Sequence, residues 1–173
     1  NGRAYNHFYL HRALLDVTIG MAKANDDPQS PRTTLRVLNA HLEAFDVENR
    51  MLHAQKTQQI AQFAIKSGQT PLVLLGDMNS VPHEAAMRHA FPDEPDTDMR
   101  ADSTIATLRS VSGLEQVGQS APDQAQWSFP AEHPNRRLDY IFVAGLSVED
   151  SRVVKLSNPP SDHLPVVTTV KIH

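Results

Sequence analysis

Residues 71–79 read Pro-Leu-Val-Leu-Leu-Gly-Asp-Met-Asn, an apolar run that stops at a glycine and is followed by polar side chains. The run is too short for a buried helix and ends at Gly76, so it predicts a central strand that is buried on both faces. Asp77 and Asn79 would then lie at the end of this strand. Taken alone, this ending is more typical of a turn in which Asp77 bonds its own backbone.

The chain before this run predicts a hairpin. Residues 12–19 are rich in β-branched side chains and predict a largely buried strand. Residues 33–38 alternate apolar and polar side chains, as a half-buried strand does. A cluster of turn formers at 24–31 would join the two strands.

A long helix is expected at residues 46–67, because apolar side chains recur there at helical spacing among polar ones. Asp46 is the expected N-cap, and Gly68 is the expected stop. The apolar positions of this helix are Met51, Ala54, Ile60, Phe63 and Ala64.

The rest of the chain predicts two short helices and three strands. The helices are expected at 84–91 and 104–112, and an acidic, proline-containing surface loop at 92–100 separates them. The strands are expected at 137–144, 148–156 and 164–172. Strands that alternate with a few helices and then run together predict an α+β sandwich with the helices outside.

Composition excludes several classes of protein. The 173 residues suit one domain, and 40% apolar with 21% charged residues predicts one packed core. A formal net charge of -4 gives no overall basic field, so a nucleic acid partner would need a local patch or a bound cation. The absence of Cys excludes disulfides, thiolate zinc sites and cysteine nucleophiles. No stretch approaches the roughly 18 consecutive apolar residues of a membrane-spanning helix.

Polar residues that can do chemistry lie at the ends of the apolar runs, and strand ends often meet at one cleft. Each has a plainer interpretation: an isolated His usually satisfies a local hydrogen bond, and Ser161-Asp162-His163 is also a plausible strand start. Asp139 is the clearest candidate, because apolar neighbours surround it and an unpaired buried charge is costly. The candidates are Asn39, His41, Asp77, Asn79, Asp139, Asp162 and His163.

These residue types favour metal-assisted hydrolysis of a phosphate ester. Carboxylate and amide oxygens suit a hard cation such as Mg²⁺, and the lack of Cys argues against zinc. A cation and neutral or cationic donors would neutralise the phosphoryl oxygens, while a carboxylate-oriented His would move a proton.

Four motifs in this order closely resemble the endonuclease/exonuclease/phosphatase superfamily, which includes deoxyribonuclease I, abasic-site endonucleases, neutral sphingomyelinases, inositol polyphosphate 5-phosphatases and deadenylases. The resemblance implies a four-layer, deoxyribonuclease I-like fold, in which helices flank a two-sheet β-sandwich. The motifs are Asn39-Ala40-His41-Leu42, Gly76-Asp77-Met78-Asn79, Arg137-Leu138-Asp139-Tyr140-Ile141-Phe142 and Ser161-Asp162-His163-Leu164-Pro165-Val166.

The resemblance also implies a role for each residue of the catalytic set. His41 would donate a hydrogen bond to the scissile phosphate, and Asp77 would position or activate the attacking water. Asn79 would hold a phosphate oxygen and orient Asp77. His163 would act as general base, with Asp139 fixing its tautomer.

Metal and substrate contacts follow from the same resemblance. Asp162 and Asp77 would hold the cation, Mg²⁺ or alternatively Mn²⁺. Asn39 would support the loop that carries His41. The segment from Trp127 to Arg137 resembles a pattern of uncharacterised bacterial members. The candidate substrate contacts are Trp127, Arg137, Asn39 and Asn79, although an aromatic residue such as Trp127 near a strand is more often a core residue.

The family resemblance makes residues 1–173 look like the C-terminal two-thirds of one domain of about 250 residues. The strand that would carry the main Mg²⁺-binding Glu would lie upstream of Asn1. We therefore expect a Mg²⁺-dependent phosphoric ester hydrolase, acting on nucleic acid, a phospholipid head group or a small phosphodiester. The alternative is a catalytically incompetent remnant that serves as a binding or scaffold module.

Overall fold

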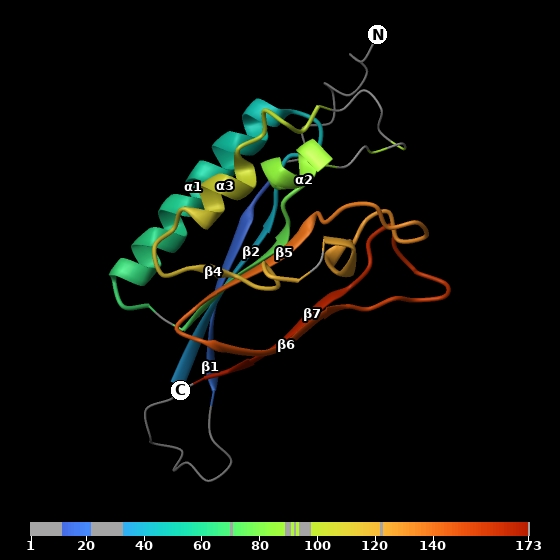
Figure 1. Cartoon of the computed structure of the whole chain (residues 1–173). Coiled ribbons are helices and arrows are strands. Elements are labelled where there is room, and N and C mark those ends of the chain that lie inside the picture. Colours follow the sequence, from blue (N-terminus) through green and yellow to red (C-terminus); the bar gives the residue numbers. More distant parts are fainter. Residues whose placement is uncertain are drawn as a thin grey trace.

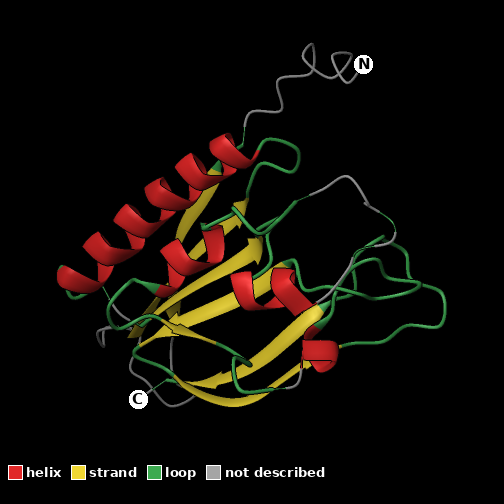
Figure 2. Ribbon diagram, turned by 45° about the horizontal axis from the view of Figure 1, so that its top comes forward, coloured by secondary structure: helices red, strands yellow, loops and turns green. Residues whose placement is uncertain are grey.

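The structure, a computed structural model, describes residues 12–21, 33–69, 71–88, 91, 93, 98–121 and 123–172. These residues form a five-stranded sheet in the order β1-β2-β3-β5-β4 and a two-stranded sheet of β6 and β7 (Figure 1). Helices α1 and α3 lie together on one side of the large sheet, and the small sheet lies on the other (Figures 1 and 2). The expected α+β sandwich is confirmed.

The elements agree with the sequence analysis to within three residues at each end, apart from two short ones, β4 and η2, which were not expected. In chain order they are β1 (Leu14–Met21), β2 (Thr33–His41), α1 (Val47–Lys66), β3 (Leu72–Asp77), α2 (His83–Arg88), α3 (Thr104–Arg109), β4 (Glu115–Gln116), the 3₁₀ helix η2 (Asp123–Gln126), β5 (Asp139–Ala144), β6 (Ser147–Val153) and β7 (Val166–Lys171). The expected turn at 24–31 and most of the expected loop at 92–100 lie outside the described residues. No helix of the described part is long and apolar enough to cross a membrane.

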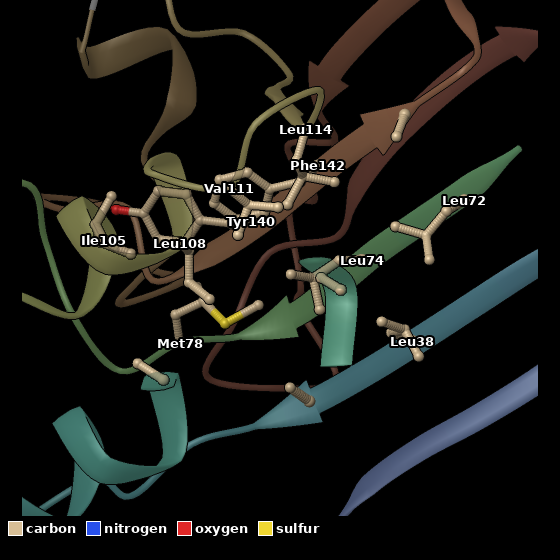
Figure 3. Close-up of a cluster of buried hydrophobic side chains, with 14 of the residues drawn as sticks. Leu38, Leu72, Leu74, Met78, Ile105, Leu108, Val111, Leu114, Tyr140 and Phe142 are labelled. Carbon is tan, nitrogen blue, oxygen red and sulfur yellow. The ribbon is translucent and has the colours of Figure 1, made fainter. Parts of the chain in front are cut away.

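The main core lies between the large sheet and its helices (Figure 3). Even-numbered residues of the central strands face this core, including Leu38, Leu74 and Phe142. Odd-numbered residues such as Val73 and Val143 face the small sheet and form a second cluster with Val170 of β7 partly buried against it. The central strand is therefore buried on both faces, as the apolar run predicted.

Helix α1 begins and ends as expected, but it packs through smaller side chains. Asp46 caps it by accepting a hydrogen bond from the backbone N–H of Asn49 at 2.9 Å. Phe63, expected on the buried face, is 65% exposed. The helix meets the core through Ala54, Ala61 and Ala64, because small side chains let it approach the sheet closely.

Strand β1 pairs with β2 as the expected antiparallel hairpin, but the expectation that it is largely buried is wrong. Leu15 is 58% exposed and Ile19 is 45% exposed. The strand lies at the edge of the large sheet, and these odd-numbered side chains face the side that carries the second cluster, which does not include them. An apolar run therefore predicted the strand correctly but not its burial.

Candidate active site

Three neighbouring strands bring three of the candidate side chains into one line. In the sheet register His41 of β2 pairs with Asp77 of β3, and Asp77 pairs with Asp139 of β5. β5 runs antiparallel to β3, so its first residue meets the last residues of the other two strands. His163, just before β7, joins them. We call His41, Asp77, Asp139 and His163 the His-Asp row.

The backbone at the end of β3 holds Asp77 in place. Gly76 has a φ of 137°, and a Cβ at this position would overlap the backbone carbonyl oxygen of Ala40 on β2. The glycine therefore allows β2 and β3 to approach closely just before the row. The two strand ends are also joined by the N–H of Leu42, which donates to the carbonyl of Asp77 at 2.9 Å.

Asn79 forms the turn that the sequence allowed and orients the Asp77 carboxylate with it. Its backbone N–H donates to Asp77 Oδ1 at 2.9 Å, and its φ of 47° lies in the left-handed region that Asn tolerates. The side-chain Nδ2 donates to Asp77 Oδ2 at 3.3 Å and to the carbonyl of Leu42 at 3.1 Å. The turn and the candidate site are thus the same structure.

Two imidazoles flank the Asp77 carboxylate. His41 Nε2 lies 3.5 Å and His163 Nε2 lies 3.8 Å from Asp77 Oδ2. On its other side, His163 Nδ1 makes a 2.7 Å hydrogen bond with Asp139 Oδ2. This bond favours the tautomer in which Nδ1 carries the proton and Nε2 faces Asp77.

The electrostatics of the row follow from partial burial and close charges. Burial raises the pKa of Asp77, the hydrogen bond from Asn79 lowers it, and the nearby Asp139 charge raises it further. The hydrogen bond to Asp139 raises the pKa of His163 above its ordinary value of 6.5, although partial burial opposes this. Asp77 and His163 therefore hold protons more tightly than the same groups would in water.

Ser128 and Phe129 fix the position of His163, and sequence analysis missed the role of Ser128. The buried Ser128 Oγ accepts from the backbone N–H groups of Leu138 at 3.2 Å and Asp139 at 3.3 Å. Its carbonyl accepts from the N–H of Leu164 at 2.7 Å. The Phe129 ring lies 4.7 Å from the His163 ring, measured between centroids. A single serine carries no sequence signal for such a bridge.

Arg50 is a second residue that sequence analysis missed. It is 1% exposed and its Nε donates to Asp102 at 2.8 Å. Its Nη1 donates to the carbonyls of Glu43 at 2.8 Å and Ala44 at 3.0 Å. These bonds tie the loop that follows His41 to helix α1. The helical pattern did not predict that Arg50 is buried, because charged residues of a helix usually face solvent.

The other candidates lie outside the row. Asn39 is exposed on β2, two residues before His41 and on the same face. Asp162 is exposed, and its backbone carbonyl accepts from Ala131 N–H at 2.7 Å. Trp127 and Arg137 both line a cavity beside α2 whose walls include no member of the row.

The row contains a plausible donor set for a cation. One ligand atom each from Asp77, Asp139 and His163 lies within 4.8 Å of the others, and all three residues are half-buried. Two carboxylates supply the oxygen atoms that Mg²⁺ and Mn²⁺ prefer. The donor chemistry therefore fits a hard divalent cation.

The chain belongs to the Endonuclease/Exonuclease/phosphatase family, whose model matches residues 3–163. This confirms the resemblance drawn from the four motifs. The enzymes that give the family its name, nucleases and phosphatases, hydrolyse phosphate esters. A comparison with curated proteins gives no match.

Solved structures share the fold at low sequence identity. An endonuclease/exonuclease/phosphatase from Beutenbergia cavernae DSM 12333 matches with a TM-score of 0.62 and 21% identity, over 93% of this chain and 39% of that chain. D. rerio TDP2 complexed with a single-strand DNA product matches with a TM-score of 0.61 and 14% identity, over 96% of this chain and 64% of that chain. A Bacteroides thetaiotaomicron VPI-5482 mannosyl-6-phosphatase matches with a TM-score of 0.58 and 18% identity, over 80% of this chain and 52% of that chain. The mannosyl-6-phosphatase and two further matched structures are covered over 52%, 51% and 53% of their own length. This chain therefore spans about half the length of such structures.

Proposed function

We propose that this domain hydrolyses phosphate esters through attack of water at phosphorus, assisted by the His-Asp row and a divalent cation, Mg²⁺ or Mn²⁺. The observation that carries the proposal is the line from Asp139 through His163 to Asp77. Asp139 bonds His163 Nδ1 at 2.7 Å, and His163 Nε2 lies 3.8 Å from Asp77 Oδ2. The family match and the similarity to a mannosyl-6-phosphatase and a DNA-bound TDP2 support the same class of reaction.

His163 is the proposed general base. With its Nδ1 proton held by Asp139, the neutral ring has its lone pair on Nε2, on the side of Asp77. A water bound between Nε2 and Asp77 Oδ2 would lose its proton to His163 as it attacks phosphorus. Asp139 then stabilises the imidazolium that forms.

His41 and Asn79 are the proposed partners of the phosphate. His41 is exposed at the end of β2, where its ring can donate to a phosphoryl oxygen. Asn79 already orients Asp77 through two hydrogen bonds, and its amide would also contact a phosphate oxygen. Donors placed where negative charge develops lower the barrier most effectively.

The cation would be held by Asp77, with Asp162 at or near it, while His163 and Asp139, the other two members of the donor set, serve proton transfer. The half-buried Asp77 carboxylate, with its raised pKa next to Asp139, is a site where a positive charge relieves repulsion. When bound, the cation would neutralise the negative charge of the phosphoryl oxygens. Asn39 is the proposed further substrate contact beside the row, whereas Arg137 and Trp127, which the resemblance also proposes as substrate contacts, line the separate cavity beside α2. The substrate class stays open between nucleic acid, a phospholipid head group and a small phosphodiester.

Hydrolysis of a chromogenic phosphodiester by the full-length protein, with Mg²⁺ or Mn²⁺, tests the proposal. His163→Ala and Asp77→Ala should each lower kcat by about 100-fold or more, since each removes a group that acts in the transition state. His133→Ala is the matched control, because His133 is exposed and lies outside the row. Full activity in His163→Ala and Asp77→Ala would refute the assignment.

A further inference from the structure

A cavity of about 320 Å³ lies beside α2 and η2, next to the segment that leads into β5. This volume is at the lower end of the range for small-molecule pockets. No member of the His-Asp row lines the cavity, so it is a separate site. Arg109, Arg136, Arg137, Gln116 and Trp127 line it, together with the carboxylates of Glu84 and Asp123.

Two of the three arginines have a carboxylate partner. Arg109 Nη1 lies 2.6 Å from Glu84 Oε1, and Arg136 Nη1 lies 2.8 Å from Asp93 Oδ2. These two charges are balanced locally.

Arg137 differs from the other two arginines. It is 8% exposed, and its Nε and Nη2 donate to the backbone carbonyls of Asp139 at 3.1 Å and Val117 at 3.0 Å. Its guanidinium lies 4.4 Å from the centroid of the Tyr140 ring. Among the residues that the structure describes, no carboxylate forms an ion pair with it.

A buried cation without a carboxylate partner is unfavourable unless another anion is present. Burial lowers the pKa of Arg137 and the Arg109 charge adds to this effect, while Tyr140 and the Asp139 carboxylate oppose it without reversing it. Both guanidinium groups line the same cavity. An anion in this cavity would give the buried Arg137 a counter-charge and would meet planar donors suited to oxyanions.

We propose that this cavity binds a small oxyanion, a phosphate or a carboxylate, through Arg137 and Arg109. The Gln116 side-chain oxygen accepts a hydrogen bond from Arg109 Nε at 2.8 Å, and this bond orients the Arg109 side chain in the cavity lining. Trp127 gives the cavity an aromatic wall against which the organic part of a ligand can pack.

Trp127 provides a site-specific measurement, because it is the one Trp in the sequence. Its fluorescence is followed while inorganic phosphate is added to the full chain, with sodium chloride of equal ionic strength as the blank. A saturable change with phosphate and none with chloride is expected. Equal responses to the two salts would overturn the proposal.

Variants locate the binding. Arg137→Met should weaken phosphate binding by about tenfold or more, because hydrogen bonds to a charged group are strong. Arg109→Gln should do the same, and it covers the case in which Arg137→Met does not fold. Arg100→Gln is the matched control, because that arginine is exposed and bonds Asp98 away from the cavity.

A last pair of measurements separates this cavity from the active site and distinguishes two ligand types. His163→Ala should keep the fluorescence response to phosphate. The proposal would be contradicted if His163→Ala lost this response while Arg137→Met and Arg109→Gln kept it. Sodium acetate is titrated in the same way. An acetate response that depends on Arg137 and is tighter than that of phosphate identifies a carboxylate ligand, and the reverse order identifies a phosphate.

Discussion

At the scale of single residues, the hydrogen bond between Asp139 and His163 makes a prediction about pH. It raises the pKa of His163 above 6.5, and a general base acts only when it is neutral. We therefore expect kcat of the full-length protein to rise with pH through this raised pKa. Asp139→Asn should lower kcat by about tenfold or more and leave KM nearly unchanged, because the imidazolium loses its carboxylate.

The same variant should move the acidic limb of the pH profile to lower pH, because the pKa of His163 falls toward its ordinary value. NMR titration of the His163 ring measures this pKa directly, and Asp150→Asn on β6 is the exposed control. An unchanged His163 pKa would contradict the assignment. The free energy of unfolding gives a second check: the stabilisation from a raised His pKa is complete below about pH 6.5 and is lost as pH rises through the folded-state pKa. Asp139→Asn should therefore cost more stability at pH 6 than at pH 9.

The residues that sequence could reveal are those that stand out against an apolar run. Asp77 and Asp139 can be found from the sequence because a carboxylate next to a buried strand is costly unless it has a partner. Arg50 and Ser128 act through backbone carbonyls and N–H groups of distant segments. Such bonds depend on where the chain folds back, and neither residue type nor spacing predicts that.

At the scale of elements, the close approach of β2 and β3 depends on Gly76, and two glycine variants test it. Gly76→Ala should destabilise the chain by about 3 kcal/mol or more, because the Cβ would overlap the Ala40 carbonyl and the φ of 137° is strained. Gly68→Ala, also at a positive φ of 68° but with nothing within 4 Å, should cost only about 1 kcal/mol. Urea unfolding of both variants measures the difference. Equal losses would mean that backbone conformation alone, and not the strand contact, requires Gly76.

Element boundaries were predictable because caps and breakers are local. Asp46 and the turn at Gly68 fix α1, and Gly76 ends the apolar part of β3. Burial was less predictable, because it depends on which layers cover a face. Phe63 lies on a helix face that none of the described layers covers, and it is exposed although its spacing placed it inside.

At the scale of the whole molecule, the row lies at one end of the face that carries the second apolar cluster. Val73 and Val143 on that face are buried, whereas Leu15 and Ile19 on β1 remain exposed. The cover of this face is therefore unequal among the residues that the structure describes. The donor set at this end of the face is where a cation would bind.

Thermal unfolding of this chain with and without Mg²⁺ therefore distinguishes an enzyme site from a binding or scaffold remnant. A ligand that binds only the folded state raises Tm, and Mg²⁺ at about 100 times its Kd would add about 2.7 kcal/mol, or about 5 °C or more for a chain of this size. We expect such a shift in the wild type and in Asp150→Asn. Asp77→Asn should abolish the shift while leaving Tm without Mg²⁺ equal or higher, because it removes a half-buried charge whose pKa burial has raised. A wild-type chain whose Tm does not respond to Mg²⁺, or an Asp77→Asn variant that responds equally, would count against a cation site at the row and in favour of the scaffold alternative.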